Sequence, residues 1–496
     1  MTIFRSALAL TLVNLLLRLA GTSFQVFLSA SIGPAGIGLL QLVLSVGGLA
    51  MVIGTGGIRT AAMYLCAEQL GRKQEENVTR TLSGCMVYSI LFSGCTALAL
   101  GALSTRIARD WIGNPETIPA LRLFASFLPC VCLCGVMTGY FTAERKIGTL
   151  AAVEVAEQLL SMAVTLGFLR FWAGNDPGKA CLSVILGSSL GACMTLLCLV
   201  FLRSRERGIL GPPIPVAGPL CRTALPLALA DTLRTGISTV ENLMVPRRLR
   251  LNAAVASPLA AFGTVTGMVF PVLMFPACIL FALAELLIPE LARCRAAGSR
   301  ERIRYLMKRS LKSALLYSLI FSGLLFLLAE PLCMKLYDSP EAGHFLKLYA
   351  LLIPLIYCDA ITDAMIKGLG QQTASVRYNI LTNLMDVIFL YLLLPRYGMA
   401  GYFFSFLVTH LVNFLLSLGC LTRITGVRIP ITVPFRAIAA LTGAAALGCL
   451  VSPPGLRISC FLPALGALLS LLGIVRQEDI RWLRGLVSGK QPSPGI

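Results

Sequence analysis

The chain carries little charge for its length. Only 13% of its 496 residues are Asp, Glu, Lys or Arg, whereas 56% are hydrophobic, and the mean hydropathy is +0.81. A soluble globular domain carries roughly 25% charged residues. Because the apolar residues extend along the whole chain, a soluble fold is excluded, and we predict an all-α protein that crosses a membrane many times.

Residues suited to catalysis or metal binding are also scarce. The chain has only two histidines, His344 and His410, and neither has metal-ligand spacing. No phosphate-binding GxxxxGK[ST] loop occurs, and no nucleophile has a suitably placed base. The 17 cysteines fall mostly in apolar runs, where thiols pack between helices. We therefore expect no catalytic residues, no metal, no cofactor and no enzymatic activity.

Acidic residues are outnumbered, with 23 Asp and Glu against 42 Lys and Arg, for a net charge of +19. A nucleic-acid partner is not predicted, because the basic residues fall mostly in short loops between apolar runs, where membrane topology explains them. With the N-terminus inside, the inner segments hold about twice as many Lys and Arg as the outer ones. Both termini are therefore expected in the cytoplasm.

About fourteen apolar runs are long enough to span a bilayer. The first is too long for a secretory signal, contains Arg18 and has no convincing cleavage site, so we expect it to be retained. The second and eighth are long enough to be tilted or broken, and the eighth contains a GxxxG pattern, typical of close helix packing. The runs lie near 5–31, 36–66, 81–104, 119–143, 148–171, 180–202, 220–245, 257–290, 310–330, 345–369, 375–394, 399–422, 431–451 and 456–475.

Four segments of the first half recur in order in the second half. RTLSGCMVYSILFSG (80–94) aligns without a gap with RSLKSALLYSLIFSG (309–323), and LRLFASFLP (121–129) with LKLYALLIP (346–354). NLLLRLAGTS (14–23) resembles ADTLRTGIST (230–239), and YLCAEQLGR (64–72) resembles LLIPELARC (286–294). Four ordered matches indicate an internal duplication. The predicted organisation is a six-helix lobe at 1–205, a cytoplasmic linker at 206–219, a second six-helix lobe at 220–425, two additional helices at 426–475 and a cytoplasmic tail at 476–496.

This organisation suggests where a substrate would bind. Because six is an even number, both lobes enter the membrane from the same side, as in parallel-repeat transporters, whose substrate site lies between the repeats. Arg18 and Arg234 are equivalent in the repeat, so both are expected to face the space between the lobes. Arg59 follows two glycines in GTGGIRTA (54–61), where the helix can bend.

Arginines inside apolar runs are the main candidates for the functional site. An arginine at a helix centre costs about 2.5–3.5 kcal/mol on insertion scales, so it usually faces a wet cavity. Guanidinium groups fork onto phosphate oxygens, which predicts an anionic substrate that carries phosphate. The alternative is structural pairing with Asp231, Glu241, Glu154 and Glu157. The predicted substrate-binding set is Arg18, Arg59, Arg234, Glu241, Arg247 and Arg248, to which the outer Arg250 adds a further guanidinium.

Three carboxylates in the second half form a second candidate site. Asp359 and Asp363 are four residues apart, hence on one helix face, and Asp386 lies in the next run. Carboxylates inside a membrane can carry a coupling ion, here H⁺ or Na⁺. An ion pair between Asp363 and Lys367 is the competing interpretation, and the sequence leaves both open.

Several segments resemble a known family. LRLAGTSFQVFLSASIGPAGIGLLQL (17–42), GMVFPVLMFPACILFALAELLIPELA (267–292) and IKGLGQQ (366–372) are similar to stage V sporulation protein B-like proteins. These belong to the polysaccharide flippases of the multidrug/oligosaccharidyl-lipid/polysaccharide exporter superfamily, which also includes the lipid II flippases. The resemblance covers nearly the whole chain.

The resemblance implies fourteen helices in two V-shaped lobes that work by alternating access in the bacterial cytoplasmic membrane. The implied substrate is a polyprenyl-diphosphate-linked saccharide that moves from the inner to the outer leaflet, with Arg18, Arg59 and Arg234 on the diphosphate and residues 431–475 forming a groove for the lipid tail. Membrane lipids and cell-wall synthesis proteins are the implied partners. The chain departs from its relatives in placing its main basic cluster at 293–309.

Two other functions remain alternatives. A drug or metabolite antiporter with the same fold, coupled to a cation, would bind cationic compounds and would need carboxylates and aromatic residues in its cavity. The chain offers arginines and only three tryptophans instead. A non-transporting scaffold for cell-wall or spore-cortex assembly would use the basic loop and tail to dock partners, but it has no need of repeat-related arginines in the membrane.

Overall fold

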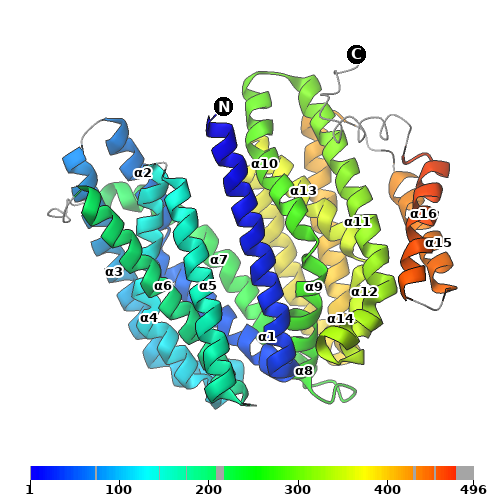
Figure 1. The fold of residues 1–496 in the computed structure, drawn as a ribbon, viewed down its shortest axis with the longest axis horizontal. Coiled ribbons are helices and arrows are strands. Elements are labelled where there is room, and N and C mark those ends of the chain that lie inside the picture. Colours follow the sequence, from blue (N-terminus) through cyan, green and yellow to red (C-terminus); the bar gives the residue numbers. More distant parts are fainter. Residues whose placement is uncertain are drawn as a thin grey trace. The chain divides into compact units, whose positions relative to one another are not determined.

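The computed structural model describes residues 2–72, 75–144, 146–174, 176–207, 217–427, 430, 432–451 and 454–475. This part of the chain consists of helices and connecting segments, without a strand, so the predicted all-α class is confirmed (Figure 1). Most of the expected linker, residues 208–216, and the expected tail, residues 476–496, lie outside the described residues.

The helices follow one another with short connections. In chain order they are α1 (Thr2–Thr55), α2 (Ile58–Gly71), α3 (Glu75–Arg106), η1 (Ile107–Ile112), η2 (Pro115–Thr117), α4 (Ile118–Ala143), α5 (Ile147–Phe168), η3 (Leu169–Ala173), α6 (Pro177–Arg207), α7 (Ala217–Leu249), α8 (Pro258–Gly263), η4 (Thr264–Val269), α9 (Phe270–Met274), α10 (Ala277–Ala296), α11 (Arg300–Tyr337), α12 (Pro340–Ala350), α13 (Ile353–Gly368), α14 (Gln372–Thr425), α15 (Thr432–Cys449) and α16 (Pro454–Leu471).

Long helices with internal breaks account for the expected spans. Within the described residues, eight helices are long and apolar enough to cross a membrane, and two bent pairs raise the number to ten. Both α1 and α14 have 54 residues and contain a break, at Gly33 (φ 72°) and Gly398 (φ 54°). Glycine adopts such positive φ values at no steric cost, and each break separates two expected spans. With α7 and α16 included, the helices match the predicted count of about fourteen.

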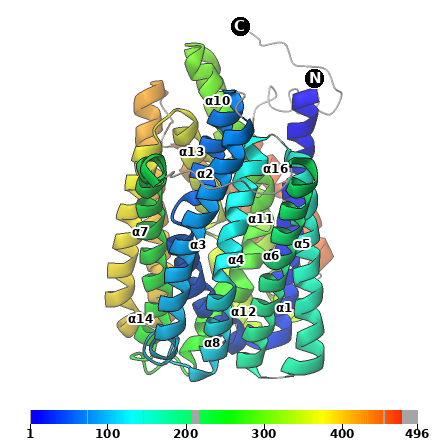
Figure 2. The same cartoon turned by 90° about the vertical axis from the view of Figure 1, so that its left-hand side faces the viewer.

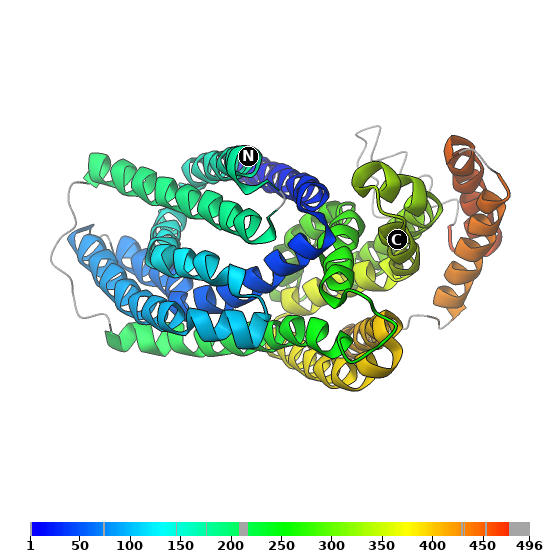
Figure 3. The same cartoon turned by 90° about the horizontal axis from the view of Figure 1, so that it is seen from below.

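The expected irregularity of the second and eighth runs is confirmed. The second run breaks after α1 at Gly56 and Gly57, and α2 continues it. The eighth run is divided into α8, the π-helical turn η4, α9 and α10, with a bend of 64° between its two parts. Figure 3 shows the bend within α1, drawn in blue.

Packing divides the chain into two units. The first unit comprises residues 1–271 and 383–405, and the second comprises residues 272–382 and 406–496. The first unit therefore combines α7, α8 and part of α14 with the first six helices. This division differs from the lobe boundary expected at 206–219, which remains a prediction from the internal repeat.

In the first unit, α3, α4, α5 and α6 run side by side (Figure 2). The core under them is apolar and includes Leu82, Val136 and Tyr140. The GxxxG pattern of the eighth run provides close packing against α1, as predicted. A Cβ atom at Gly263 would collide with the Pro34 carbonyl oxygen, so only a glycine lets α8 approach α1 this closely.

In the second unit, α11 packs against α12, α13, α15 and α16. The Phe461 ring of α16 lies directly on Gly323 of α11, where a Cβ would displace it. The bend before α10 is held by two phenols: Tyr317 donates to the Pro276 carbonyl at 2.7 Å, and Tyr357 donates to the Leu273 carbonyl at 2.7 Å. These bonds fix the two tyrosine side chains to the backbone at the bend.

Candidate functional site

Helices α1 and α7 form a polar seam that ends in a pocket. The Thr239 hydroxyl donates to the Ser45 carbonyl at 3.1 Å, and the Asn242 side-chain amide donates to the Ser45 hydroxyl at 3.0 Å. One to two turns further along both helices, the seam opens into a pocket of about 470 Å³. The pocket is lined by Val52, Asp231, Arg234, Thr235, Ser238 and Asn383.

Arg234 is the cation of this pocket. Its side chain is exposed, and within the described residues it forms neither an ion pair nor a hydrogen bond. Thr235, Ser238 and Asn383 add hydroxyl and amide groups, while Asp231 adds one carboxylate. A guanidinium beside hydroxyl and amide groups is suited to an anionic group. Of the predicted arginines, Arg234 is the one that lines this pocket.

Arg59 and Arg18 lie elsewhere in the first unit. Arg59 is in the first turn of α2, directly after the glycine break, and its side chain is exposed. The described residues place no carboxylate within 4.0 Å of Arg59, although Glu154 of α5 is near enough to interact with it electrostatically. Arg18 is exposed on the first part of α1, where its carbonyl accepts a hydrogen bond from Thr22 at 2.9 Å.

The end of α7 carries the remaining predicted arginines. Arg248 stacks on the Tyr391 ring of α14, with its guanidinium carbon 3.3 Å from the ring centroid. This cation–π contact fixes the side chain. Arg247 is exposed on the same turn. Arg250 lies against Gly113, which follows η1.

Glu241 has an acidic partner. Its carboxyl group lies next to that of Asp386 on α14, and the Ser405 hydroxyl donates to Asp386 from the other side of the Gly398 break. The sequence predicted both residues, but in separate sites, because 145 positions separate them and no local pattern connects them.

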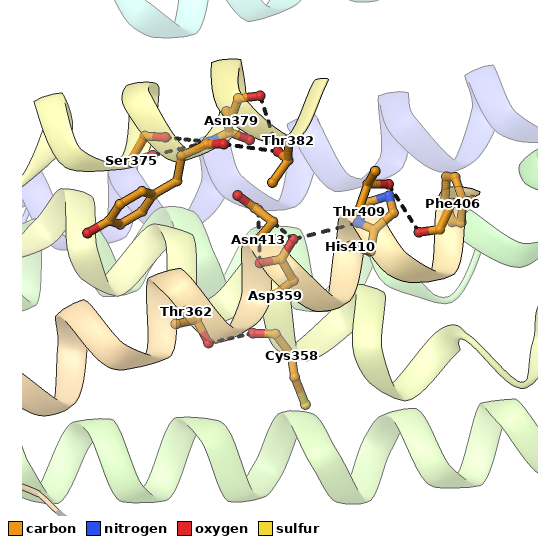
Figure 4. A network of polar contacts seen from close by, with 11 residues as sticks. Cys358, Asp359, Thr362, Ser375, Asn379, Thr382, Phe406, Thr409, His410 and Asn413 are labelled. Carbon is orange, nitrogen blue, oxygen red and sulfur yellow. Dashed lines mark hydrogen bonds and ion pairs between the residues drawn. The ribbon is translucent and has the colours of Figure 1, made fainter. Parts of the chain in front are cut away.

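Asp359 lies in a second polar network, in the second unit (Figure 4). It is only 7% exposed, and the Asn413 amide donates to both of its oxygens, at 3.1 and 2.9 Å. His410 Nδ1 lies 3.7 Å from the same carboxylate, and the centroid of its ring lies 4.2 Å from that of Phe406. The Asn413 side-chain oxygen is buried without a hydrogen-bond partner in the described part of the chain. An unpartnered acceptor beside a buried carboxylate is suited to a small cation.

Asp363 has a different environment one turn further along α13. It forms an ion pair with Lys367 at 2.6 Å and accepts a hydrogen bond from Ser375. The structure thus contains the ion pair that was one of two expectations for this carboxylate. Sequence reasoning missed Asn413, His410 and Ser405, whose only signal was polarity within apolar runs.

Comparisons with known proteins agree with the helical architecture. Residues 3–210 match the family described as polysaccharide biosynthesis protein, and residues 226–392 match the MatE family. Stage V sporulation protein B of Bacillus subtilis is 22% identical over 422 residues, covering 81% of this chain and 80% of that protein. A probable lipid II flippase, MurJ of Rhizobium meliloti, is 26% identical over 264 residues, which are 50% of this chain and 47% of that protein.

Solved structures share the fold. A lipid II flippase MurJ in an inward closed conformation superimposes with a TM-score of 0.70 at 12% identity, covering 97% of this chain and 100% of that one. An inward-facing multidrug-resistance transporter of the MATE family gives a TM-score of 0.66 at 13% identity, covering 84% and 100%. The chain thus has the multi-pass helical fold of these membrane transporters. These similarities to polysaccharide biosynthesis proteins, MatE proteins and a lipid II flippase agree with the resemblance predicted from the sequence.

Proposed function

We propose that the protein is an alternating-access flippase that moves a polyprenyl-diphosphate-linked saccharide from the inner to the outer leaflet of the bacterial cytoplasmic membrane. The observation that carries this proposal is the pocket between α1, α7 and α14, in which Arg234 has no carboxylate within ion-pair distance in the described residues. An arginine without a protein counter-ion is stabilised by an anionic ligand. A diphosphate supplies two such groups, and the names of the relatives point to a lipid-linked saccharide.

The seam beside the pocket supports alternating access. The glycine contact of α8 with α1 and the Ser45 hydrogen bonds hold α1 to α8 and α7 on one side of the pocket. In this proposal the seam opens on that side while the other side closes, and the diphosphate stays on Arg234. Arg18 and Arg59 receive the headgroup before this step, and Arg247 and Arg248 release it. The exposed apolar residues of α15 and α16, Phe435 and Leu471 among them, accommodate the lipid tail.

Two sites are suited to coupling by H⁺ or Na⁺. Glu241 and Asp386 bring two carboxyl groups together, and such a pair can bind a proton or a small cation. Asp359 and the unpartnered oxygen of Asn413 provide ligands for a small cation. Asp363 is not needed for this role, because Lys367 neutralises it.

A cation antiporter is the second candidate, and one observation favours it. Asp231 lines the same pocket as Arg234, so the pocket also offers a carboxylate to an organic cation. The match of residues 226–392 to the MatE family is consistent with this function. A non-transporting scaffold is the third candidate, since stage V sporulation protein B is named for a developmental process.

Reconstituted liposomes separate these functions. A fluorescent polyprenyl-diphosphate sugar would be placed in one leaflet and its appearance in the other followed for wild type, Arg234→Ala and Asp231→Ala, with the exposed Arg109→Ala as the control. The flippase predicts that Arg234→Ala reduces the flipping rate at least about tenfold, because charge-assisted hydrogen bonds to phosphate are lost. Uptake of an organic cation that depends on Asp231 would favour the antiporter. The absence of both activities in folded protein would favour the scaffold.

The orientation in the membrane is part of the proposal and can be tested separately. Both termini are placed in the cytoplasm by the bias of Lys and Arg. Cysteines introduced near each terminus and in the segment 252–256 would be labelled in intact cells with an impermeant maleimide. Labelling of the segment 252–256 alone supports the orientation, whereas labelling of the termini alone reverses it.

A further inference from the structure

A second pocket of the first unit lies where one end of α4, α5 and α6 meets. Its volume is about 480 Å³. Its lining is mostly apolar and aromatic: Pro119, Arg122, Leu123, Ser126, Phe168, Trp172, Leu182 and Leu186. It shares no residue with the Arg234 pocket, and the proposed transport cycle does not use it. One charged side chain, Arg122, stands in this apolar lining.

Within the described residues, no ion pair balances the charge of Arg122. Its Nε donates to the Ser104 hydroxyl at 3.3 Å. In the described part of the chain, no carboxylate lies within 4.0 Å and its two terminal amino groups have no partner. The guanidinium keeps its charge under all ordinary conditions. Beside an apolar pocket, such a group is stabilised by an anion from outside the protein.

The internal repeat provides a reference for this position. The match between residues 121–129 and 346–354 aligns Arg122 with Lys347. Lys347 forms an ion pair with Glu330 at 3.4 Å, and its amino group lies 5.4 Å from the centroid of the Phe326 ring. The second half thus neutralises its basic residue with a carboxylate. In the first half, the neutral Ser104 hydroxyl is the partner.

Aromatic residues indicate the depth of the pocket in a membrane. Trp172 lies in the π-helical turn η3 at the end of α5, and its ring meets that of Phe168 edge to face at 6.4 Å. Tryptophans are enriched at the level of lipid headgroups. The Lys179 amino group lies 5.9 Å from the centroid of the Trp172 ring, although Asp176 partly neutralises it at 3.7 Å. Arg122 therefore lies where lipid phosphates are found.

We infer that this pocket binds an anionic phospholipid from the leaflet at this end of the helices. The phosphate lies on the free amino groups of Arg122, and one acyl chain lies along Leu123, Leu182 and Leu186. Charge complementarity selects this occupant, because the pocket offers one cation at headgroup level and an apolar wall below it. The site is independent of the transported substrate, so it would exist in a flippase, an antiporter or a scaffold.

Lipid binding can be counted directly. Delipidated protein in detergent would be titrated with phosphatidylglycerol, and bound lipids counted by native mass spectrometry, for wild type, Arg122→Gln and the repeat-matched control Lys347→Gln. We expect Arg122→Gln to weaken the tightest lipid site about tenfold or more, the effect of losing charge-assisted hydrogen bonds, and Lys347→Gln to leave it unchanged. Equal affinities in wild type and Arg122→Gln, or an equal loss in both variants, would overturn the inference.

A second variant tests the apolar part of the pocket without removing the charge. Leu186→Trp fills the pocket and leaves Arg122 in place, so we expect it to weaken phosphatidylglycerol binding as well. Full affinity in Leu186→Trp would show that the lipid does not enter the pocket. Inorganic phosphate at millimolar concentration should not displace the lipid, and dioleoylglycerol, which has no phosphate, should not bind at this site. Displacement by phosphate, or binding of dioleoylglycerol with equal affinity, would contradict the assigned ligand.

Discussion

The two halves of the chain repeat one helical framework but balance their charges differently. In the first half, Arg59 and Arg122 have no carboxylate within 4.0 Å in the described residues. In the second half, Lys347 and Lys367 each form an ion pair with a carboxylate, at 3.4 and 2.6 Å. The second half also contains Asp359, whose partners are an amide and a histidine.

This difference shows that the duplication preserves helix packing but allows the partners of charged residues to change. Helix packing depends on apolar surface and small residues, which both halves keep. A charge in a membrane costs free energy unless a partner or ligand balances it, so each half can specialise by changing one partner. Arg59 and Arg122 of the first half are thus suited to anionic ligands, and Asp359 of the second half is suited to a small cation.

The largest effect is expected when Asp359 loses its amide partner. Asn413→Leu removes both hydrogen bonds to a buried carboxylate, so we expect the protein to lose about 3 kcal/mol of stability. The midpoint of thermal unfolding in detergent measures this loss. The control is Asn379→Leu, since Asn379 donates mainly to the Ser375 carbonyl at 2.8 Å and should cost about 1 kcal/mol. Similar losses in both variants would contradict a special role of the Asn413 hydrogen bonds to Asp359.

A smaller effect is expected for the ion pair of the same helix. Lys367→Met leaves Asp363, whose side chain is 20% exposed, with only its Ser375 hydrogen bond. We expect a loss of about 1–2 kcal/mol, because partial exposure moderates the cost of an unpaired charge. The matched variant Lys347→Met breaks a pair with side chains 41% and 65% exposed and should cost less than about 1 kcal/mol. Unfolding midpoints in the reverse order would contradict this ranking by burial.

Ser104→Asp would give Arg122 a carboxylate partner, as Lys347, its equivalent in the internal repeat, has in Glu330. Ser104 is fully buried and within hydrogen-bond distance of the guanidinium. We expect phosphatidylglycerol affinity to fall about tenfold because the new carboxylate competes with the phosphate, with stability changing by about 1 kcal/mol. Ser104→Asn, which has nearly the same shape but no charge, is the control in the same titration. Equal affinities in the two variants would show that charge balance at Arg122 does not govern binding.

Much of the fold could be predicted from the sequence, since bilayer crossing needs runs of about twenty apolar residues and these are local features. The breaks in the second and eighth runs could also be predicted. The glycines after Thr55 and the excess length of both runs indicated them. The interaction partners of the charged residues could not be predicted from such local features. Glu241 and Asp386 are brought together by packing between α7 and α14, and so is Asp359 with Asn413, 54 residues away. The Asp363–Lys367 ion pair could be predicted from the sequence, because a spacing of four residues places both side chains on one helix face.

The smallest effect on stability is expected at Arg59. A substitution at Arg59 is therefore the sharpest test of whether an arginine without an ion pair binds the substrate. Because the described residues place no carboxylate within 4.0 Å of its guanidinium, Arg59→Gln should change the free energy of unfolding by less than about 0.5 kcal/mol. If Arg59 serves the substrate, the flipping rate in liposomes should nevertheless fall several-fold in the same preparation. Glu154→Gln separates the two roles. If Arg59 binds the ligand, Glu154→Gln should leave the stability unchanged. If Arg59 instead has a structural role with Glu154, Arg59→Gln and Glu154→Gln should be equally destabilising, and Arg59 would not belong to the substrate path.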